Sequence, residues 1–373
     1  MTEQLKLKLN DSKATRWGAL VIVAFTMMAA YYVNDVVAPL KTMLETDLAW
    51  SSTDFGFFTG GYSFLNVFFL MLIWGGLILD RFGIRFTGKL ATILMVGGTA
   101  LEYYAMTGLA GADATLFGIN EIFGYKTGVF VAFAGYSIFG VGAEVAGITV
   151  SKIIAKWFKG KELATAMGVQ VALARIGSQA GYAVAIPLAR AFGISTPVLL
   201  GLVLLLGGMI AFFIFAVMDK KLDKQMEAAA IAAGTEDEEE KFSFKDVKNI
   251  LVNPGFWLIA LLCVLFYSCV FPFQKFASEL MIIKYGINEN VAGTFAGLPA
   301  LGALILTPVF GGFIDKRGKS ASIMLLGSAM LICVHFIYAI PDINYWLVAI
   351  VLMIILGIAF SLVPSAMWPA VAK

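Results

Sequence analysis

Long apolar stretches recur along most of this chain, and they constrain its fold more than any other feature. A helix crosses the hydrocarbon core of a bilayer with about 20 predominantly apolar residues, and it satisfies its own backbone polar groups there. We therefore predict an all-α integral membrane protein. Ten spans are expected, at residues 15–38, 54–79, 86–107, 127–151, 162–188, 197–217, 254–282, 290–314, 320–339 and 345–368.

The composition excludes several other classes of protein. Apolar residues make up 60% of the chain and charged residues 14%, against about 25% charged in soluble domains. A net charge of +2 provides no field that would attract nucleic acid. The three cysteines have no metal-ligand spacing, and the single histidine, His335, cannot complete a catalytic triad. We expect no enzyme activity, no metal site, no cofactor and no nucleic-acid partner.

The basic residues predict how the chain is oriented. Most of the 27 Lys and Arg residues fall in loops that would share one side of the membrane with the N-terminus, and such residues concentrate on the cytoplasmic side. Residues 1–16 are polar and basic, and no small-residue cleavage site follows them. We expect a retained first helix and a cytoplasmic N-terminus. In the absence of a sorting signal, a prokaryotic plasma membrane is the expected location.

A charged, Ala-rich segment at residues 219–253 interrupts the apolar pattern. It predicts a cytoplasmic linker between an N-terminal six-helix bundle at 1–218 and a partial C-terminal bundle of four helices at 254–373. The acidic run from Glu236 to Glu240 is either a solvated segment or a regulatory docking site.

An internal repeat predicts that the two bundles are related. A Gly-rich helix end followed by aspartate, a basic residue and a glycine turn occurs after the second span of each half. The spacing favours close helix contact at the first glycine and a tight cytoplasmic turn, and the carboxylates can hold the bundles together when the cytoplasmic side is closed. The alternative is a simple positive-inside turn. The residues of this predicted latch are Gly76, Asp80, Arg81, Gly83, Arg85, Asp315, Lys316 and Gly318.

The repeat resembles the signature loop of the major facilitator superfamily, Gly-x-x-x-Asp-Arg-x-Gly-x-Arg. The runs at 140–144, 156–163 and 174–178 are further similar to its subfamily of lysosomal dipeptide uniporters, that of major facilitator superfamily domain-containing protein 1. The resemblance implies a two-bundle fold of twelve helices. Ten are counted here, so helices 11 and 12 are expected to be missing, either because the gene product is truncated or because the sequence stops early.

Ionisable residues inside the spans are the candidates for substrate binding, because each costs about 2.5–3.5 kcal/mol to insert. Arg175 lies about 20 Å along its helix from Glu162, near the midplane, and Glu144 about 10 Å from the cytoplasmic surface. The family resemblance implies that Glu144 binds the ammonium group and Arg175 the carboxylate of a dipeptide, with a bidentate guanidinium contact. The alternative is a structural ion pair without a ligand.

Two further residues are weaker candidates. Asp35 lies at the outer end of the first span. It takes part in substrate binding or proton exchange if burial raises its pKa, or it acts as a gate or cap at the end of the helix. Lys275 follows Pro272 in the seventh span and either contacts a substrate carboxylate or reaches toward the membrane interface. Tyrosines are expected as cavity walls, and acidic residues near outer helix ends as interfacial groups. The tyrosines are Tyr31, Tyr32, Tyr62, Tyr182 and Tyr267, and the acidic residues are Glu102 and Glu279.

The leading hypothesis is a secondary transporter that moves a small zwitterionic or anionic solute, a dipeptide first of all, by alternating access. Uniport and proton symport both remain open, as do amino acids and monocarboxylates as substrates. The competing hypothesis is a truncated, non-transporting membrane-interaction protein or fragment. The expected partners are the solute and the lipid bilayer, and the sequence does not indicate whether an accessory subunit takes part.

Overall fold

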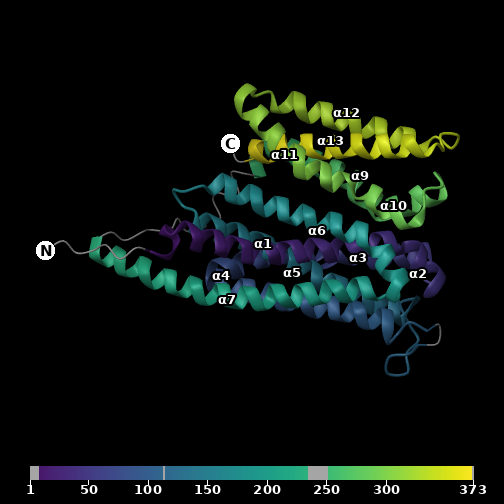
Figure 1. Ribbon diagram of the computed structural model, residues 1–373, viewed down its shortest axis with the longest axis horizontal. Coiled ribbons are helices and arrows are strands. Elements are labelled where there is room, and N and C mark those ends of the chain that lie inside the picture. The colour runs from purple at the N-terminus through teal and green to yellow at the C-terminus, as the bar shows by residue number, and fades with distance from the viewer. Residues whose placement is uncertain (1–7, 112–113, 234–250, 372–373) are drawn as a thin grey trace. The chain divides into compact units, whose positions relative to one another are not determined.

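The computed structural model describes residues 8–111, 114–233 and 251–371, and nearly all of them are helical (Figure 1). The chain divides into two compact units, Met1–Ala229 and Ala230–Lys373. The first unit contains the 3-10 helices η1 (Leu9–Asp11) and η2 (Ala38–Leu40), the helices α1 (Lys13–Val36), α2 (Lys41–Asp47), α3 (Ser52–Phe68), α4 (Met71–Thr107), α5 (Thr127–Trp157), α6 (Leu163–Phe192) and α7 (Thr196–Ala233), and the antiparallel strands β1 (Glu121–Ile122) and β2 (Tyr125–Lys126).

The second unit is built from helices alone in its described part. It contains α9 (Pro254–Ile283), α10 (Glu289–Ala296), α11 (Leu298–Arg317), α12 (Ser320–Ala339) and α13 (Trp346–Val371). Helix α13 packs against both α11 and α12, and Ile314, Ile323, Leu362 and Ala366 form a buried apolar cluster where these helices meet.

Each of the ten predicted spans contains helix, but the number of membrane-crossing helices differs from the prediction. Seven helices of the described residues are long and apolar enough to cross a membrane, or eight if α3 and α4 count as one bent span. These two helices are bent by 58° at a break where Leu70 adopts a left-handed conformation. Neither the count of ten nor the absence of helices 11 and 12 is confirmed.

The predicted boundary between the first bundle and its linker falls inside a helix. Helix α7 continues from Thr196 to Ala233, so the first residues of the expected linker, Asp219 among them, are helical. The acidic run at 236–240 lies outside the described residues. The assignment of 1–218, 219–253 and 254–373 to two bundles and a linker stays a prediction.

Two glycines of the first unit let pairs of helices approach closely. A Cβ at Gly140 of α5 would lie 2.3 Å from the carbonyl oxygen of Tyr62 on α3. A Cβ at Gly177 of α6 would lie 2.1 Å from the carbonyl oxygen of Met28 on α1. Only glycine permits such backbone contact, which small residues commonly provide between membrane helices. The pairs α3–α5 and α1–α6 therefore pack tightly.

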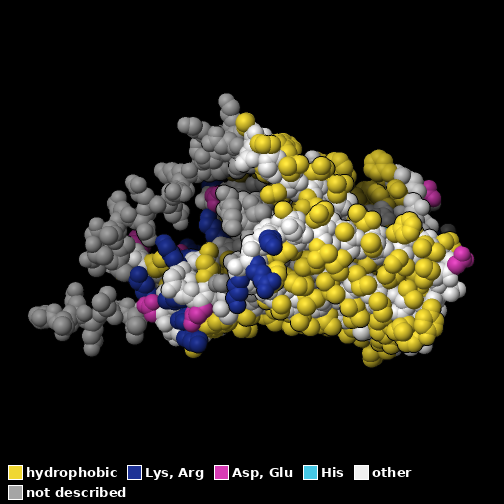
Figure 2. All heavy atoms as spheres, turned by 90° about the horizontal axis from the view of Figure 1, so that it is seen from above, with side chains coloured by type: hydrophobic (Ala, Val, Ile, Leu, Met, Phe, Trp, Pro, Cys, Tyr) yellow, Lys and Arg dark blue, Asp and Glu magenta, His cyan; other side chains and the backbone are white. Residues whose placement is uncertain are grey.

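The surface is apolar over much of its area. Figure 2 shows apolar side chains covering most of the visible face, whereas charged side chains lie mainly toward the ends of the view. Large aliphatic side chains such as Val203, Ile210, Leu258 and Leu325 are more than half exposed. Water-soluble monomers rarely expose apolar patches of this extent, so the surface is that of a multi-pass membrane protein.

Candidate functional site

Glu144 is held by a tyrosine from a neighbouring helix. The hydroxyl of Tyr62 on α3 donates a hydrogen bond of 2.8 Å to Oε1 of Glu144 on α5. The close approach at Gly140, one helical turn before Glu144, brings α3 near enough for this bond. Both side chains are half-buried. The carboxylate thus has a fixed position inside the first unit.

Arg175 is placed by the other tight helix pair. Its guanidinium carbon lies 5.6 Å from the ring centroid of Tyr31 on α1, within the range of a cation–π interaction. Gly177, two residues further along α6, permits the contact of α6 with α1 at Met28. Arg175 is also half-buried.

The two tyrosines connect these charges. Tyr31 and Tyr62 lie near each other in the first unit. Glu144 with Tyr62, and Arg175 with Tyr31, therefore occupy one region formed by α5, α3, α1 and α6. We call these four residues the tyrosine-linked row. The structure therefore brings the two predicted charges into one region of the first unit, through two tyrosines that the sequence also singled out.

Asp35 belongs to an adjoining polar network near the end of α1. The side-chain amide of Asn34 donates to Oδ1 of Asp35 at 2.8 Å. The hydroxyl of Tyr136 on α5 donates to the backbone oxygen of Asn34 at 2.7 Å, with the Oδ1 of Asn34 at 3.1 Å. The rings of Tyr136 and Tyr62 are 5.7 Å apart. Asp35 thus lies one aromatic ring away from the tyrosine-linked row.

The expectation that Glu102 is interfacial is wrong, because this side chain is fully buried. Glu102 lies on the face of α4 that packs against α5, in a stripe with Met95, Gly98, Thr99 and Ala105, and it interacts electrostatically with Tyr136. The spacing of small residues before Glu102 was the signal that could have placed it inside the bundle.

Lys275 lies in α9 of the second unit, where it is half-buried and follows Pro272 inside the helix. The structure describes each unit by itself, so it brings Glu144, Arg175 and Asp35 together but does not relate Lys275 to them. A substrate contact at Lys275 stays a prediction.

The first copy of the repeat forms the turn that the sequence predicted. Gly83 has a positive φ of 75° and breaks the helical path within α4, a conformation that glycine adopts most readily. Asp80 before the turn accepts from Lys152 of α5 at 2.9 Å. Arg81 is exposed and its guanidinium carbon lies 5.6 Å from the Phe82 ring.

Arg85, after the turn, joins a cluster of charged residues around the buried Asp219, which the sequence did not predict. Asp219 of α7 is fully buried and accepts from Arg85 at 3.2 Å, from Lys156 at 2.7 Å and from the indole of Trp157 at 3.0 Å. Asp223, one helical turn later, contacts Arg85 and Lys156. We call these five residues the Asp219 cluster. Asp219 and Asp223 are spaced i, i+4 directly after an apolar run, and this spacing was the sequence signal that both aspartates continue the helix.

The second copy of the repeat ends a helix in the same manner. Helix α11 stops at Arg317, and Gly318 then has a positive φ of 66°. Lys316 is in the last turn of α11. Within the first unit, the close helix contact that was expected at Gly76 is made by Gly75. A Cβ at Gly75 would lie 2.5 Å from Val145 of α5, whereas a Cβ at Gly76 meets nothing within 4 Å.

Asp11 and Arg16, near the start of the described chain, form ion pairs with the loop that connects α5 to α6. Arg16 contacts both carboxylate oxygens of Glu162, through Nη2 at 2.8 and 3.0 Å. The ammonium group of Lys161 donates to Asp11 at 2.9 Å, and this bond lowers the pKa of Asp11. The pKa of Glu162 is lowered by the backbone N–H of Glu162 itself and by Arg16. These four residues form an N-terminal clasp.

Known proteins resemble this chain over most of its length. Lysosomal dipeptide transporter MFSD1 of Homo sapiens is 28% identical over 373 residues, which cover 96% of this chain and 73% of that protein. The protein of the same name from Gallus gallus is 32% identical over 251 residues, 64% of this chain and 54% of that protein.

Solved structures share the fold at low sequence identity. The D-xylose-proton symporter has a TM-score of 0.61 at 15% identity and covers 95% of this chain and 87% of its own. Tetrameric PepTSo2 has a TM-score of 0.63 at 12% identity and covers 93% and 82%. The sequence profile of the Major Facilitator Superfamily matches residues 19–373. This chain belongs to the Major Facilitator Superfamily, and it is a multi-pass membrane transporter rather than an enzyme.

Proposed function

We propose that this transporter moves dipeptides by alternating access, with Glu144 binding the ammonium end of the substrate and Arg175 its carboxylate end. The observation that carries the proposal is the tyrosine-linked row, in which both charges occupy one region of the first unit. The name of the curated relatives, lysosomal dipeptide transporter, supports this class of substrate.

The chemistry of the two side chains suits the two ends of a zwitterion. A carboxylate accepts hydrogen bonds at both oxygens, and Tyr62 uses only Oε1 of Glu144 in the bond that the structure gives it. An ammonium group of the substrate is a matching donor. The guanidinium of Arg175 presents planar N–H donors that match a carboxylate in a bidentate contact. Opposite charges at the two ends also set the direction in which a dipeptide binds.

The energetics of the membrane interior favour a ligand-binding role. A charged side chain in a span costs about 2.5–3.5 kcal/mol on insertion scales and usually marks a substrate or ion pathway. Glu144 and Arg175 are only half-buried within the first unit, so each keeps surface for a further contact. A structural role alone would be met as well by apolar residues of similar size.

The adjoining residues have secondary roles in this proposal. Asp35 lies beside the tyrosine-linked row through Tyr136 and is the group on which coupling to protons would depend. Lys275 is an added contact for the substrate carboxylate. The Asp80–Lys152 pair and the Asp219 cluster keep α4, α5 and α7 together as one body, which alternating access requires. The basic loops support a cytoplasmic N-terminus, and a prokaryotic plasma membrane is the location that we propose.

Uptake of radiolabelled dialanine by proteoliposomes tests the proposal. Glu144→Gln and Arg175→Gln are each expected to reduce the initial rate at low substrate concentration at least about tenfold, because each loses a charge-assisted contact of about 1.5–3 kcal/mol. Glu121→Gln in the exposed β1 strand is the matched control and should transport normally. Unchanged uptake in both site variants would refute the proposed site.

Competition with unlabelled solutes tests the substrate class in the same vesicles. Dialanine in excess is expected to abolish the labelled uptake, whereas alanine and lactate should compete weakly. Lactate has no ammonium group to bind Glu144, and the two charges of alanine are closer together than those of a dipeptide. Stronger competition by alanine or by lactate than by dialanine would assign the carrier to amino acids or to monocarboxylates.

A further inference from the structure

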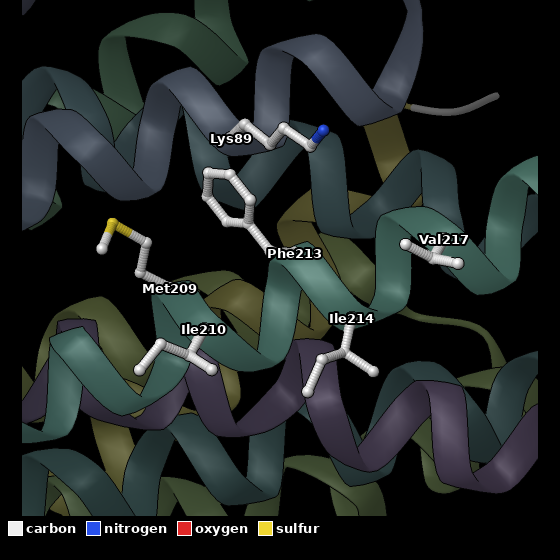
Figure 3. Close-up of a pocket in the computed structure, with 6 residues that line it drawn as sticks. All are labelled: Lys89, Met209, Ile210, Phe213, Ile214 and Val217. Atoms are coloured by element: carbon white, nitrogen blue, oxygen red, sulfur yellow. The ribbon is translucent and has the colours of Figure 1, made fainter.

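A groove on the surface of the first unit is separate from the tyrosine-linked row. It has a volume of about 540 Å³ and is formed by one residue of α4 and five of α7 (Figure 3). Its lining residues are Lys89, Met209, Ile210, Phe213, Ile214 and Val217. The five α7 residues recur at helical spacing and therefore lie on one face of that helix. All five are apolar, and among the described residues that line the groove Lys89 is the charged one.

The local sequence explains why this face is left open. A Cβ at Gly88 of α4 would lie 1.9 Å from the ring of Phe212, so the glycine gives this ring its place between α4 and α7. Phe212 is buried, while its neighbour Phe213 turns outward beneath Lys89. Ile210 and Val217 are 60% and 66% exposed. In a membrane protein, such an apolar face is covered by lipid chains.

Lys89 carries a charge that no acidic side chain of the described residues pairs with. Its ammonium group lies 5.1 Å from the centroid of the Phe213 ring. The nearby aspartates of the Asp219 cluster bind Arg85 and Lys156 instead. Lys89 follows Arg85 by one helical turn, about 6 Å along α4, so it lies on the bilayer side of this cluster.

We propose that the groove binds one anionic phospholipid, whose phosphate pairs with Lys89 and whose acyl chain lies along the apolar face of α7. The distance along α7 from Met209 to Val217 is about 12 Å, which gives an acyl segment a continuous apolar bed. The long apolar stem of lysine lets its ammonium group reach toward the headgroup level. A phosphate supplies the negative charge that the acidic side chains of residues 8–111, 114–233 and 251–371 do not place beside Lys89.

The position of the lipid gives it a structural effect. It would bridge α4 and α7 on the bilayer side of the Asp219 cluster and strengthen the contact between these two helices. The expected consequence is that anionic lipids stabilise the first unit independently of any transported solute.

Mass spectrometry of intact complexes of the full chain with phosphatidylglycerol, and separately with phosphatidylcholine, tests the inference. The wild type should retain one phosphatidylglycerol more tightly than phosphatidylcholine. Lys89→Gln should weaken this retention about fivefold, the change that corresponds to about 1 kcal/mol for one basic residue near the membrane surface. Lys89→Arg should keep it, because the charge remains.

Two further variants complete the test. Ile214→Trp fills the groove without removing the charge and should also weaken retention, while Lys220→Gln removes an exposed charge of α7 outside the groove and should not. Thermal melting of each variant without added lipid shows whether it is folded. Equal retention of both lipids by the wild type, full retention by Ile214→Trp, or the same loss in Lys220→Gln as in Lys89→Gln would overturn the proposal.

Discussion

Tyr62 on α3 and Glu144 on α5 are joined by a hydrogen bond of 2.8 Å from the phenol to the carboxylate. The two residues are far apart in the sequence, and the close contact of their helices at Gly140 makes the bond possible. The bond gives the proposed ammonium-binding group a fixed orientation, so the phenol is a positioning group.

Removing the Tyr62 hydroxyl is expected to weaken substrate binding. Tyr62→Phe keeps the ring but leaves Glu144 without this donor, and a hydrogen bond to a charged group contributes about 1.5–3 kcal/mol. The KM for dialanine uptake should rise about tenfold. Tyr104→Phe, at an exposed position on α4, is the matched control. Equal KM values for Tyr62→Phe and the wild type would show that the bond does not orient the site.

Neutralising Asp219 is expected to destabilise the first unit. Asp219→Asn removes the buried carboxylate to which Arg85, Lys156 and Trp157 donate, while Asp223 still pairs with the two cations. Hydrogen bonds to a charged group contribute about 1.5–3 kcal/mol, so the melting temperature in nanodiscs should fall by about 5 °C. Asp223→Asn removes the same charge from a side chain that is 42% exposed, and it should cost much less. Similar melting temperatures for the two variants would contradict the central position of Asp219 in its cluster.

Adding a methyl group at Gly177 is expected to separate α1 from α6. A Cβ there would lie 2.1 Å from a backbone oxygen, which cannot move aside like a flexible side chain. Gly177→Ala should lose most of its uptake, because Tyr31 and Arg175 belong to the same helix pair. Gly168→Ala on the same helix, where a Cβ meets nothing within 4 Å, should retain it. Uptake by Gly177→Ala at the level of Gly168→Ala would show that this helix contact is dispensable.

The N-terminal clasp is expected to weaken in acid. The pKa values of Asp11 and Glu162 are lowered from their ordinary values of 3.8 and 4.5, so these carboxylates stabilise the folded state above those values. The stabilisation is lost as pH falls through the lowered pKa values. Melting curves between pH 6 and pH 3 should show a steeper loss for the wild type than for Arg16→Gln. Parallel curves would indicate that the Arg16–Glu162 contact does not contribute.

The sequence predicted the features that depend on local pattern and composition. Apolar length predicted the helices, and glycine spacing predicted the turns that Gly83 and Gly318 make with positive φ. Glu144 and Arg175 were found because charges inside apolar runs are rare. Their placement in one region of the first unit was expected from their depth along two neighbouring helices.

The features that the sequence did not predict depend on packing between distant segments. Asp219 was assigned to a linker because charged residues follow it, whereas its burial depends on Arg85, Lys156 and Trp157 from two other helices. Glu102 was assigned to the interface from its place near a helix end, although its helix face packs on α5. The 58° bend between α3 and α4 lies in an apolar run without proline.

The most direct test of the proposed site is a calorimetric titration of wild type, Glu144→Gln and Arg175→Gln with dialanine, N-acetyl-dialanine and dialanine amide. If Glu144 binds the ammonium group, Glu144→Gln should lose affinity for dialanine and for its amide but not for the acetylated peptide. Arg175→Gln should lose affinity for dialanine and the acetylated peptide but not for the amide. Equal losses for all three ligands in each variant, or no loss in either, would contradict the assignment of the two charges to the two ends of one substrate.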